Sequence, residues 1–248
     1  MTRSYDVDGP PGAPAIVFVH GTRLTRSMWR AQLDDLRDTY RVIALDLPGH
    51  GALADQPFSV VAASDEVARV IEDAAGGRAV VVGLSLGGYV AMDLAARRPA
   101  LVRGLVLSGA TAEPIGLRAM PFLALAWAME RFNGPRLDAL NRWFFRTRFA
   151  PSIARPIIAG GFWSAGGAVA LRAVIGRRFA PRLARYAGPT LILNGQYDVL
   201  FRLFAPSFAR AAREARRVRL GGATHLANLD RPAAFSSAVR RFTGSIDR

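Results

Sequence analysis

The stretch best suited to chemistry places a serine between two glycines, Gly83-Leu84-Ser85-Leu86-Gly87. Three valines precede this motif, and apolar residues at helical spacing follow it up to Arg97-Arg98-Pro99. The order predicts a buried strand, a sharp turn and a helix, the arrangement known as a nucleophile elbow. The glycines remove the Cβ atoms that would collide where the strand and the helix pack closely. We therefore predict that Ser85 is a nucleophile whose hydroxyl projects from the turn.

A serine hydroxyl is a poor nucleophile at neutral pH, so it needs a histidine base and a carboxylate that fixes the tautomer of that histidine. The chain contains three histidines. His225 follows the last expected strand in a glycine-rich loop that is able to fold over a site. His20 and His50 each precede a glycine in a turn after an early strand, which favours a role in shaping loops. We predict His225 as the base, with a purely structural histidine as the alternative.

Two acidic residues follow expected strands and are candidates for the carboxylate. Asp198 comes after the strand expected at 190–194, and Glu113 comes after the strand that ends near Leu107. With Asp198, the three residues occur in the chain order Ser, Asp, His that this kind of elbow is known for. We therefore predict Asp198 as the acid and keep Glu113 as its rival. The alternative is that Asp198 is an ordinary aspartate in a solvent-exposed turn.

The elements that must position these residues alternate between strand and helix. Helical spacing is clear at 59–75 and 232–242, and strands are expected at 15–19, 41–45, 80–82, 102–107, 190–194 and 217–220. Such alternation predicts an α/β fold with a doubly wound, mostly parallel sheet. Loops at the carboxyl ends of parallel strands meet at one edge, so the three predicted residues are expected to converge there. Residues 1–14 leave room for at most a short edge strand.

Residues 111–188 break the alternation. They contain no strand-like run, their aromatic and arginine residues are interleaved, and prolines divide them into short helical segments. We predict that they form a helical cap, or lid, inserted into one α/β core made of residues 1–110 and 189–248. The apolar residues of this segment are numerous enough to line a hydrophobic acyl pocket, although some must also hold the cap to the sheet.

The composition narrows the class of protein. A chain of 248 residues with 51% hydrophobic content is long enough to bury the core of one such unit. There is no cysteine, which excludes disulfides and thiolate zinc sites, and the histidines lack paired metal-ligand spacing. We expect neither a metal nor a cofactor. No apolar run reaches the ~20 residues that cross a bilayer, and no signal peptide is evident, so we expect a cytoplasmic protein.

The net charge of +14 comes from 33 arginines, because the sequence has no lysine. The codon bias of a GC-rich genome is one explanation for this choice. However, 12 of the arginines lie in residues 111–188, alongside only Glu113, Glu130 and Asp138. This concentration predicts that the cap attracts an anionic partner, such as an acidic lipid surface or an acyl chain on an acidic carrier protein. Binding of nucleic acid is not favoured, because no recognised basic module is present.

The sequence resembles the α/β-hydrolase-fold serine hydrolases, of the capped ester and lactone hydrolase type. The resemblance rests on five motifs in register: Val17-Phe18-Val19-His20-Gly21, Asp46-Leu47-Pro48-Gly49-His50-Gly51, Gly83-Leu84-Ser85-Leu86-Gly87-Gly88, Asn194-Gly195-Gln196-Tyr197-Asp198 and Ala223-Thr224-His225. It implies an eight-stranded sheet. It also implies an oxyanion hole formed by the backbone N–H groups of Thr22 and Leu86.

Together, the residues and the resemblance predict hydrolysis of a carboxylic ester, lactone or thioester with a hydrophobic acyl group, through a covalent acyl-enzyme. Ser85 would attack the carbonyl carbon, His225 would transfer the proton, and Asp198 would stabilise the imidazolium. Serine at the nucleophile position disfavours the dehalogenase and epoxide hydrolase branches, which have aspartate there. Cofactor-free perhydrolysis and C–C bond hydrolysis use the same triad, and the fold also serves as a non-catalytic ligand receptor. The sequence leaves these three functions open.

Overall fold

The computed structural model describes residues 3–246, which contain one seven-stranded sheet in the order β1-β3-β2-β4-β5-β6-β7. The strands are β1 (Tyr5–Asp8), β2 (Ala15–Val19), β3 (Arg41–Leu45), β4 (Ala79–Leu84), β5 (Val102–Ser108), β6 (Pro189–Gly195) and β7 (Glu214–Leu220). Only β1 is antiparallel to its neighbour, so the predicted mostly parallel sheet is confirmed. The implied eighth strand is not among the described residues, because the lead-in before β2 supplies a single edge strand.

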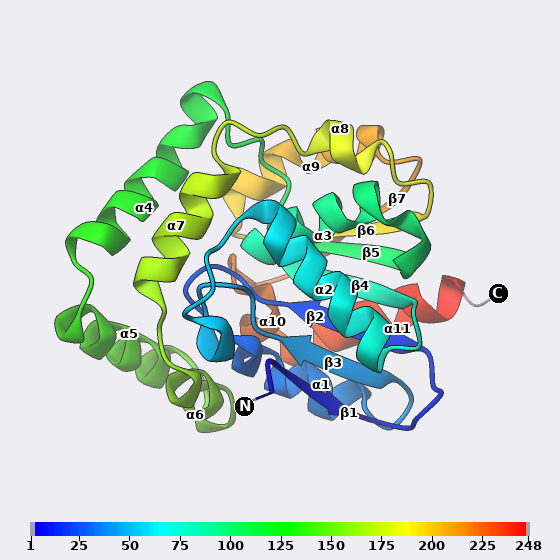
Figure 1. Cartoon of the computed structure of the whole chain (residues 1–248), viewed down its shortest axis with the longest axis horizontal. Helices are drawn as coiled ribbons and strands as arrows, with labels where there is room; N and C mark the ends of the chain where they lie inside the picture. Colours follow the sequence, from blue (N-terminus) through cyan, green and yellow to red (C-terminus); the bar gives the residue numbers. More distant parts are fainter. Residues whose placement is uncertain (1–2, 247–248) are drawn as a thin grey trace.

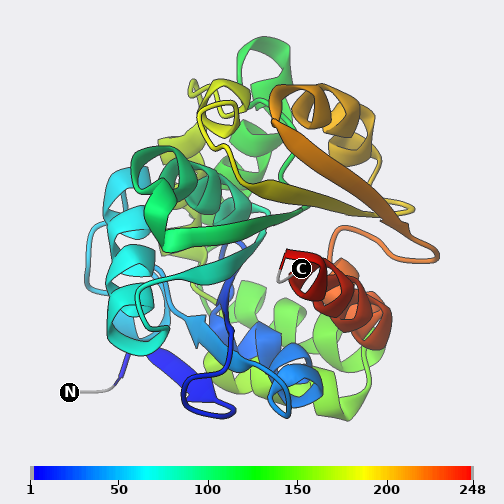
Figure 2. The same ribbon diagram turned by 90° about the vertical axis from the view of Figure 1, so that its right-hand side faces the viewer.

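Helices cover both faces of the sheet (Figures 1 and 2). Helices α1 (Arg30–Leu36) and α11 (Pro232–Ile246) pack on one face. The other face is covered by α2 (Val60–Ala74), α3 (Leu86–Arg97), α8 (Ala180–Leu183) and α9 (Val199–Ala211). Successive residues of a strand point to opposite faces, so the fully buried β2 contributes Val17 to one apolar cluster and Phe18 to the other.

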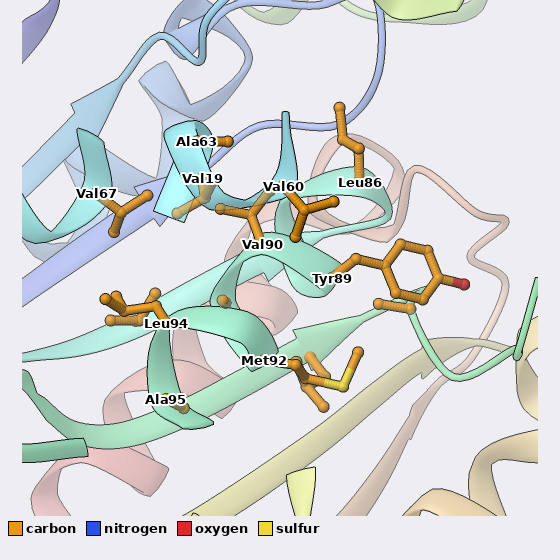
Figure 3. Close-up of a cluster of buried hydrophobic side chains, with 14 of the residues drawn as sticks. Val19, Val60, Ala63, Val67, Leu86, Tyr89, Val90, Met92, Leu94 and Ala95 are labelled. Atoms are coloured by element: carbon orange, nitrogen blue, oxygen red, sulfur yellow. The ribbon is translucent and has the colours of Figure 1, made fainter. Parts of the chain in front are cut away.

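Helix α3 is held firmly in this arrangement because it is buried along most of its length. Val90 and Leu94 of α3 meet Val60 and Val67 of α2 in a cluster that also contains Val19 (Figure 3). The start of α3 is therefore fixed relative to the end of β4. The residue between these two elements is Ser85.

Four longer helices lie between β5 and β6: α4 (Met120–Arg131), α5 (Pro135–Arg148), α6 (Pro151–Gly160) and α7 (Ser164–Val174). They gather at one side of the sheet (Figure 1). Prolines open α5 and α6, where the missing N–H costs nothing. This segment is helical as expected, while its treatment as a separate cap stays a prediction. No single described helix is long and apolar enough to cross a membrane; the pair α6 and α7 passes that test only together and is bent by 87°.

Candidate active site

Ser85 occupies a sharp turn between β4 and α3. Its backbone has φ 53° and ψ −116°, a conformation that residues other than glycine rarely adopt. The turn is held because the Ser85 N–H donates a hydrogen bond to the carbonyl oxygen of Ser108 (2.8 Å), and the Ser85 carbonyl accepts one from Gly88 N–H (2.9 Å). A Cβ on Gly83 would collide with the backbone of Gly87, and one on Gly87 with the carbonyl of Val19. The strand–turn–helix geometry therefore requires the glycines that the sequence supplies.

His225 and Asp198 lie side by side at the carboxyl edge of the sheet. The Nδ1 atom of His225 is 3.1 Å from Oδ2 of Asp198. The Asp198 side chain is only 6% exposed, and it directly precedes α9. The ring of Phe201 stacks on His225 with a centroid distance of 4.9 Å. With Nδ1–H donated to the carboxylate, Nε2 of His225 is left as the proton acceptor.

A glycine that the sequence analysis did not single out makes room for this pair. Gly109, at the end of β5, has φ +56°. A Cβ at this position would lie 2.7 Å from Cε1 of His225 and 3.0 Å from Oδ2 of Asp198, well inside ordinary contact. Both the backbone conformation and the space therefore require glycine. The only signal in the sequence was its place just after a buried strand.

A second acid, Asp230, holds the loop that carries His225. Its Oδ2 accepts hydrogen bonds from the N–H and the hydroxyl of Thr224, both at 2.6 Å. Its Oδ1 accepts one from Nη2 of Arg148 in α5 at 2.5 Å, and its side chain is almost fully buried. The histidine loop is thus tied to the helical segment between β5 and β6. Sequence reasoning missed this link because the two partners are far apart in the chain.

The other acid that the sequence offered lies elsewhere. The carboxylate of Glu113 accepts hydrogen bonds from the N–H groups of Phe179 (2.8 Å) and Ala180 (2.7 Å), so it caps the start of α8. It is therefore occupied away from His225, whereas Asp198 is the acid that the fold brings to the histidine.

His20 and His50 are buried and hydrogen-bonded to backbone groups, as expected for loop-shaping residues. Nε2 of His20 accepts from Leu47 N–H (3.0 Å), and Nε2 of His50 accepts from Arg23 N–H (3.2 Å). Burial lowers the pKa of His20 to about 4. Burial, with a smaller effect from the nearby His20, lowers the pKa of His50 to about 3. Both rings are therefore neutral at pH 7, and each joins two loops.

A cavity of about 320 Å³ opens onto Ser85 and His225. Its walls are mostly apolar and come from α4, α5, α7 and α9, with Phe122, Leu125, Phe144, Phe145, Leu171, Leu200 and Phe201 among the lining residues. Thr22, in the loop after β2, also lines the cavity, and Leu86 follows the serine. Within residues 3–246, neither of these two N–H groups has a hydrogen-bond acceptor. They are thus free to bind an oxyanion.

This arrangement brings together two groups that acyl transfer uses, because a serine in a strained turn and a histidine in contact with a carboxylate line the same apolar cavity. Among the described residues, no group of three or more histidine, aspartate and glutamate side chains is arranged to hold a metal ion.

Known proteins resemble this chain in sequence. Residues 16–238 match the sequence profile of the Alpha/beta hydrolase family. Over 104 residues, 42% of this chain, the sequence is 41% identical to a pimeloyl-(acyl-carrier protein) methyl ester esterase from Neisseria meningitidis. This match spans only 39% of that relative, and the other first relatives are also matched over less than half of their length.

Solved structures resemble the whole chain. A hydrolase from Pseudomonas aeruginosa has a TM-score of 0.81 and 28% identity, with 97% of this chain and 93% of that chain covered. An enol-lactonase from Burkholderia xenovorans has a TM-score of 0.80 and 25% identity, with 97% and 95% covered.

Proposed function

We propose that this chain, which belongs to the alpha/beta hydrolase family, is a serine esterase that uses Ser85, His225 and Asp198 as its catalytic triad. The observation that carries this proposal is the contact between His225 and the buried Asp198, together with the cavity that His225 and the strained Ser85 both line. The family match, together with relatives and structures named as esterases and lactonases, supports ester hydrolysis as the reaction type.

The reaction proceeds in two halves. Oγ of Ser85 attacks the ester carbonyl carbon while Nε2 of His225 takes the hydroxyl proton, and the N–H groups of Thr22 and Leu86 bind the developing oxyanion. The C–O bond to the leaving alcohol then breaks, and the alcohol departs with the proton from His225. Water, deprotonated by the same nitrogen, attacks the acyl-enzyme, and the acid leaves as Ser85 regains its proton. Asp198 stabilises the imidazolium in both halves.

The acyl group is hydrophobic and lies under the helices between β5 and β6. This part of the proposal rests on the phenylalanine and leucine side chains that form the cavity walls. It treats residues 111–188 as a cap on a core of residues 1–110 and 189–248. The cavity is at the small end of the usual range for ligand sites, which favours a medium-length acyl chain over a large polycyclic one.

The carrier of the ester is anionic, either an acidic carrier protein or an acidic lipid surface. The support is the excess of arginine in residues 111–188 and the exposed Trp127 and Trp143 on α4 and α5. Within the described chain, Arg142 and Arg146 have no carboxylate partner, which leaves their charge available. Arg148, in contrast, is paired with Asp230 and is not a free charge.

The test of catalysis combines labelling with turnover. A phosphonate that reacts with active-site serines should modify Ser85, and a panel of p-nitrophenyl esters, lactones and acyl thioesters should identify the bond that is cleaved. If no panel member is turned over and Ser85 is not labelled, the protein is better explained as a ligand receptor. Turnover that requires hydrogen peroxide would instead indicate a perhydrolase, and cleavage of C–C bonds alone would indicate a C–C bond hydrolase.

The test of the anionic carrier is the salt dependence of kcat/KM for one neutral and one anionic ester of equal chain length. The Debye length falls from ~30 Å at 0.01 M salt to ~8 Å at 0.15 M, so steering of the anionic ester should weaken. Charge reversal at Arg142 and Arg146 should remove the difference in salt dependence between the two esters, whereas charge reversal at Arg217 on β7 should not. Equal salt dependence for both esters in the unaltered protein would leave codon bias as the explanation.

A further inference from the structure

The catalytic cavity contains one arginine. Arg23 follows Thr22 in the loop after β2 and lines the same cavity as Ser85 and His225. No aspartate or glutamate lines this cavity, and apart from Thr22, Ser85 and His225 the remaining lining residues have apolar side chains or are glycine. A permanently charged guanidinium in an apolar wall is costly unless something compensates its charge.

The protein itself does not supply a counter-charge for Arg23. Its Nη1 donates a hydrogen bond to Oδ1 of Asn141 in α5 at 2.6 Å, and no carboxylate among residues 3–246 lies within ion-pair distance. Burial alone lowers the pKa of Arg23, although arginine stays protonated. Other partly buried arginines differ, since Arg26 pairs with Asp46 and Arg182 pairs with Asp93.

The backbone of Arg23 is held in place from two sides. Its φ is 57°. Arg23 and Ser85 are the only non-glycine residues with a positive φ in the described chain. Its N–H donates to Nε2 of the buried His50 (3.2 Å), and its carbonyl accepts from Trp163 N–H (2.9 Å). Strained backbone of this kind persists where surrounding contacts over-determine it, which is common at binding sites.

The hydrogen-bond partner of Arg23 also carries an unused donor. Asn141 is only 4% exposed, and its Nδ2 has no acceptor among the described residues. Because Oδ1 of the same amide is bound to Arg23, a second buried N–H donor lies close to the guanidinium. Asn141 does not line the cavity, so only Arg23 can meet a ligand there. Guanidinium groups bind carboxylates through two parallel hydrogen bonds, so the Arg23 side chain suits an anion rather than a neutral group.

We propose that Arg23 binds an anionic group of the substrate, so that the natural ester carries a free carboxylate in addition to the bond that is cleaved. This inference rests on the proposed esterase function, and it names the class of ester that the cavity selects. The alternative is that Arg23 only ties the loop after β2 to α5. A neutral donor would serve that purpose without placing an uncompensated charge in the cavity wall.

The experiment compares matched esters in matched variants. One substrate is the monomethyl ester of a dicarboxylic acid, which places the carboxylate on the acyl side. The second is an acetate ester of an ω-hydroxy acid, which places it on the leaving group, and neutral esters of equal length are the references. The variants are Arg23→Met, Arg23→Lys and the control Arg217→Met, which removes the same charge from the exposed edge of β7.

For the unaltered protein, one of the two anionic esters should have a higher kcat/KM than its neutral reference. Arg23→Met should reduce this preference by about 10- to 100-fold, mainly through KM, because charge-assisted hydrogen bonds to the substrate are lost. Arg23→Lys should keep part of the preference, and Arg217→Met should keep all of it. The preference should also persist at high salt, since a charge in a cavity is screened much less than one on the surface.

Two outcomes would overturn the inference. The first is an Arg23→Met variant that keeps the full preference for the anionic ester. The second is an equal loss of kcat/KM for anionic and neutral esters together with a lower Tm, which would show that Arg23 only holds the loop after β2 to α5. A binding measurement distinguishes failure of the proposed role of Arg23 from failure of the proposed esterase function. Calorimetry with Ser85→Ala protein and free dicarboxylates of four to seven carbons should detect binding that Arg23→Met abolishes. Absence of binding in the Ser85→Ala protein would reject the site even if esters are cleaved.

Discussion

Replacing Gly109 by alanine should impair catalysis without unfolding the protein. The new Cβ would lie 2.7 Å from Cε1 of His225 and 3.0 Å from Oδ2 of Asp198. Ordinary contacts begin near 3.4 Å, so the ring and the carboxylate must each retreat by several tenths of an ångström. The backbone must also keep φ +56° with a side chain attached.

The displacement of the catalytic groups determines the loss of activity, and the backbone conformation determines the loss of stability. Displacing a catalytic group by ~1 Å costs about 100-fold in rate, so we expect kcat/KM to fall by about 10- to 100-fold. Alanine in the left-handed conformation costs ~1–2 kcal/mol, which lowers Tm by roughly 2–8 °C in a chain of this size. The expected loss of kcat/KM is therefore larger than the small loss of stability could cause.

A control glycine isolates the clash from the backbone effect. Gly76, after α2, has φ +67°, and no atom lies within 4 Å of the position that a Cβ would occupy. Gly76→Ala should therefore lower Tm to a similar extent while kcat/KM stays at the level of the unaltered protein. Activity with a p-nitrophenyl ester and thermal unfolding would be measured for both variants. Equal activity of the Gly109→Ala and Gly76→Ala variants would show that a Cβ at position 109 does not disturb His225 and Asp198.

Three further predictions concern titratable groups. Asp198→Asn should lower kcat by about 10⁴-fold, because the histidine is left in the wrong tautomer, whereas Glu113→Gln should mainly lower Tm; the reverse ranking would move the catalytic acid to Glu113. The free energy of unfolding, measured with urea, should fall as the pH drops below about 6.5. In the unfolded chain His20 and His50 bind protons near that pH, whereas in the folded protein their pKa values are about 4 and about 3, so acid favours the unfolded chain. Stability that increases on acidification would contradict this. Asp230→Ala should lower kcat more than it raises KM, since it frees the histidine loop; unchanged kinetics would show that the loop holds without it.

The parts of the molecule that follow short-range patterns could be predicted from the sequence. Valine-rich runs indicated the parallel strands, and the glycines around Ser85 indicated the elbow, because each pattern has one favourable structure. The meeting of Asp198 and His225 followed from their places after β6 and β7, which are neighbours in the sheet. This meeting was expected from the sequence only because both residues follow parallel strands, whose carboxyl ends lie at one edge; the order of the strands was not predicted.

Other features depend on long-range contacts and could not be predicted. Strand β7 begins at Glu214 rather than at Arg217, because an exposed edge strand tolerates charged side chains that hide its pattern. The unpaired charge of Arg23 depends on which residues surround it, and neither composition nor spacing contains that information.

The claim that Ser85 is the nucleophile can be tested by measuring the intact mass of the protein during turnover of an activated ester. A covalent acyl adduct should map to Ser85. In a Ser85→Ala variant that remains folded, the adduct should be absent and turnover should fall by a factor of ~10⁴ or more. A folded Ser85→Ala protein that still hydrolyses the ester at a near-normal rate would contradict the claim.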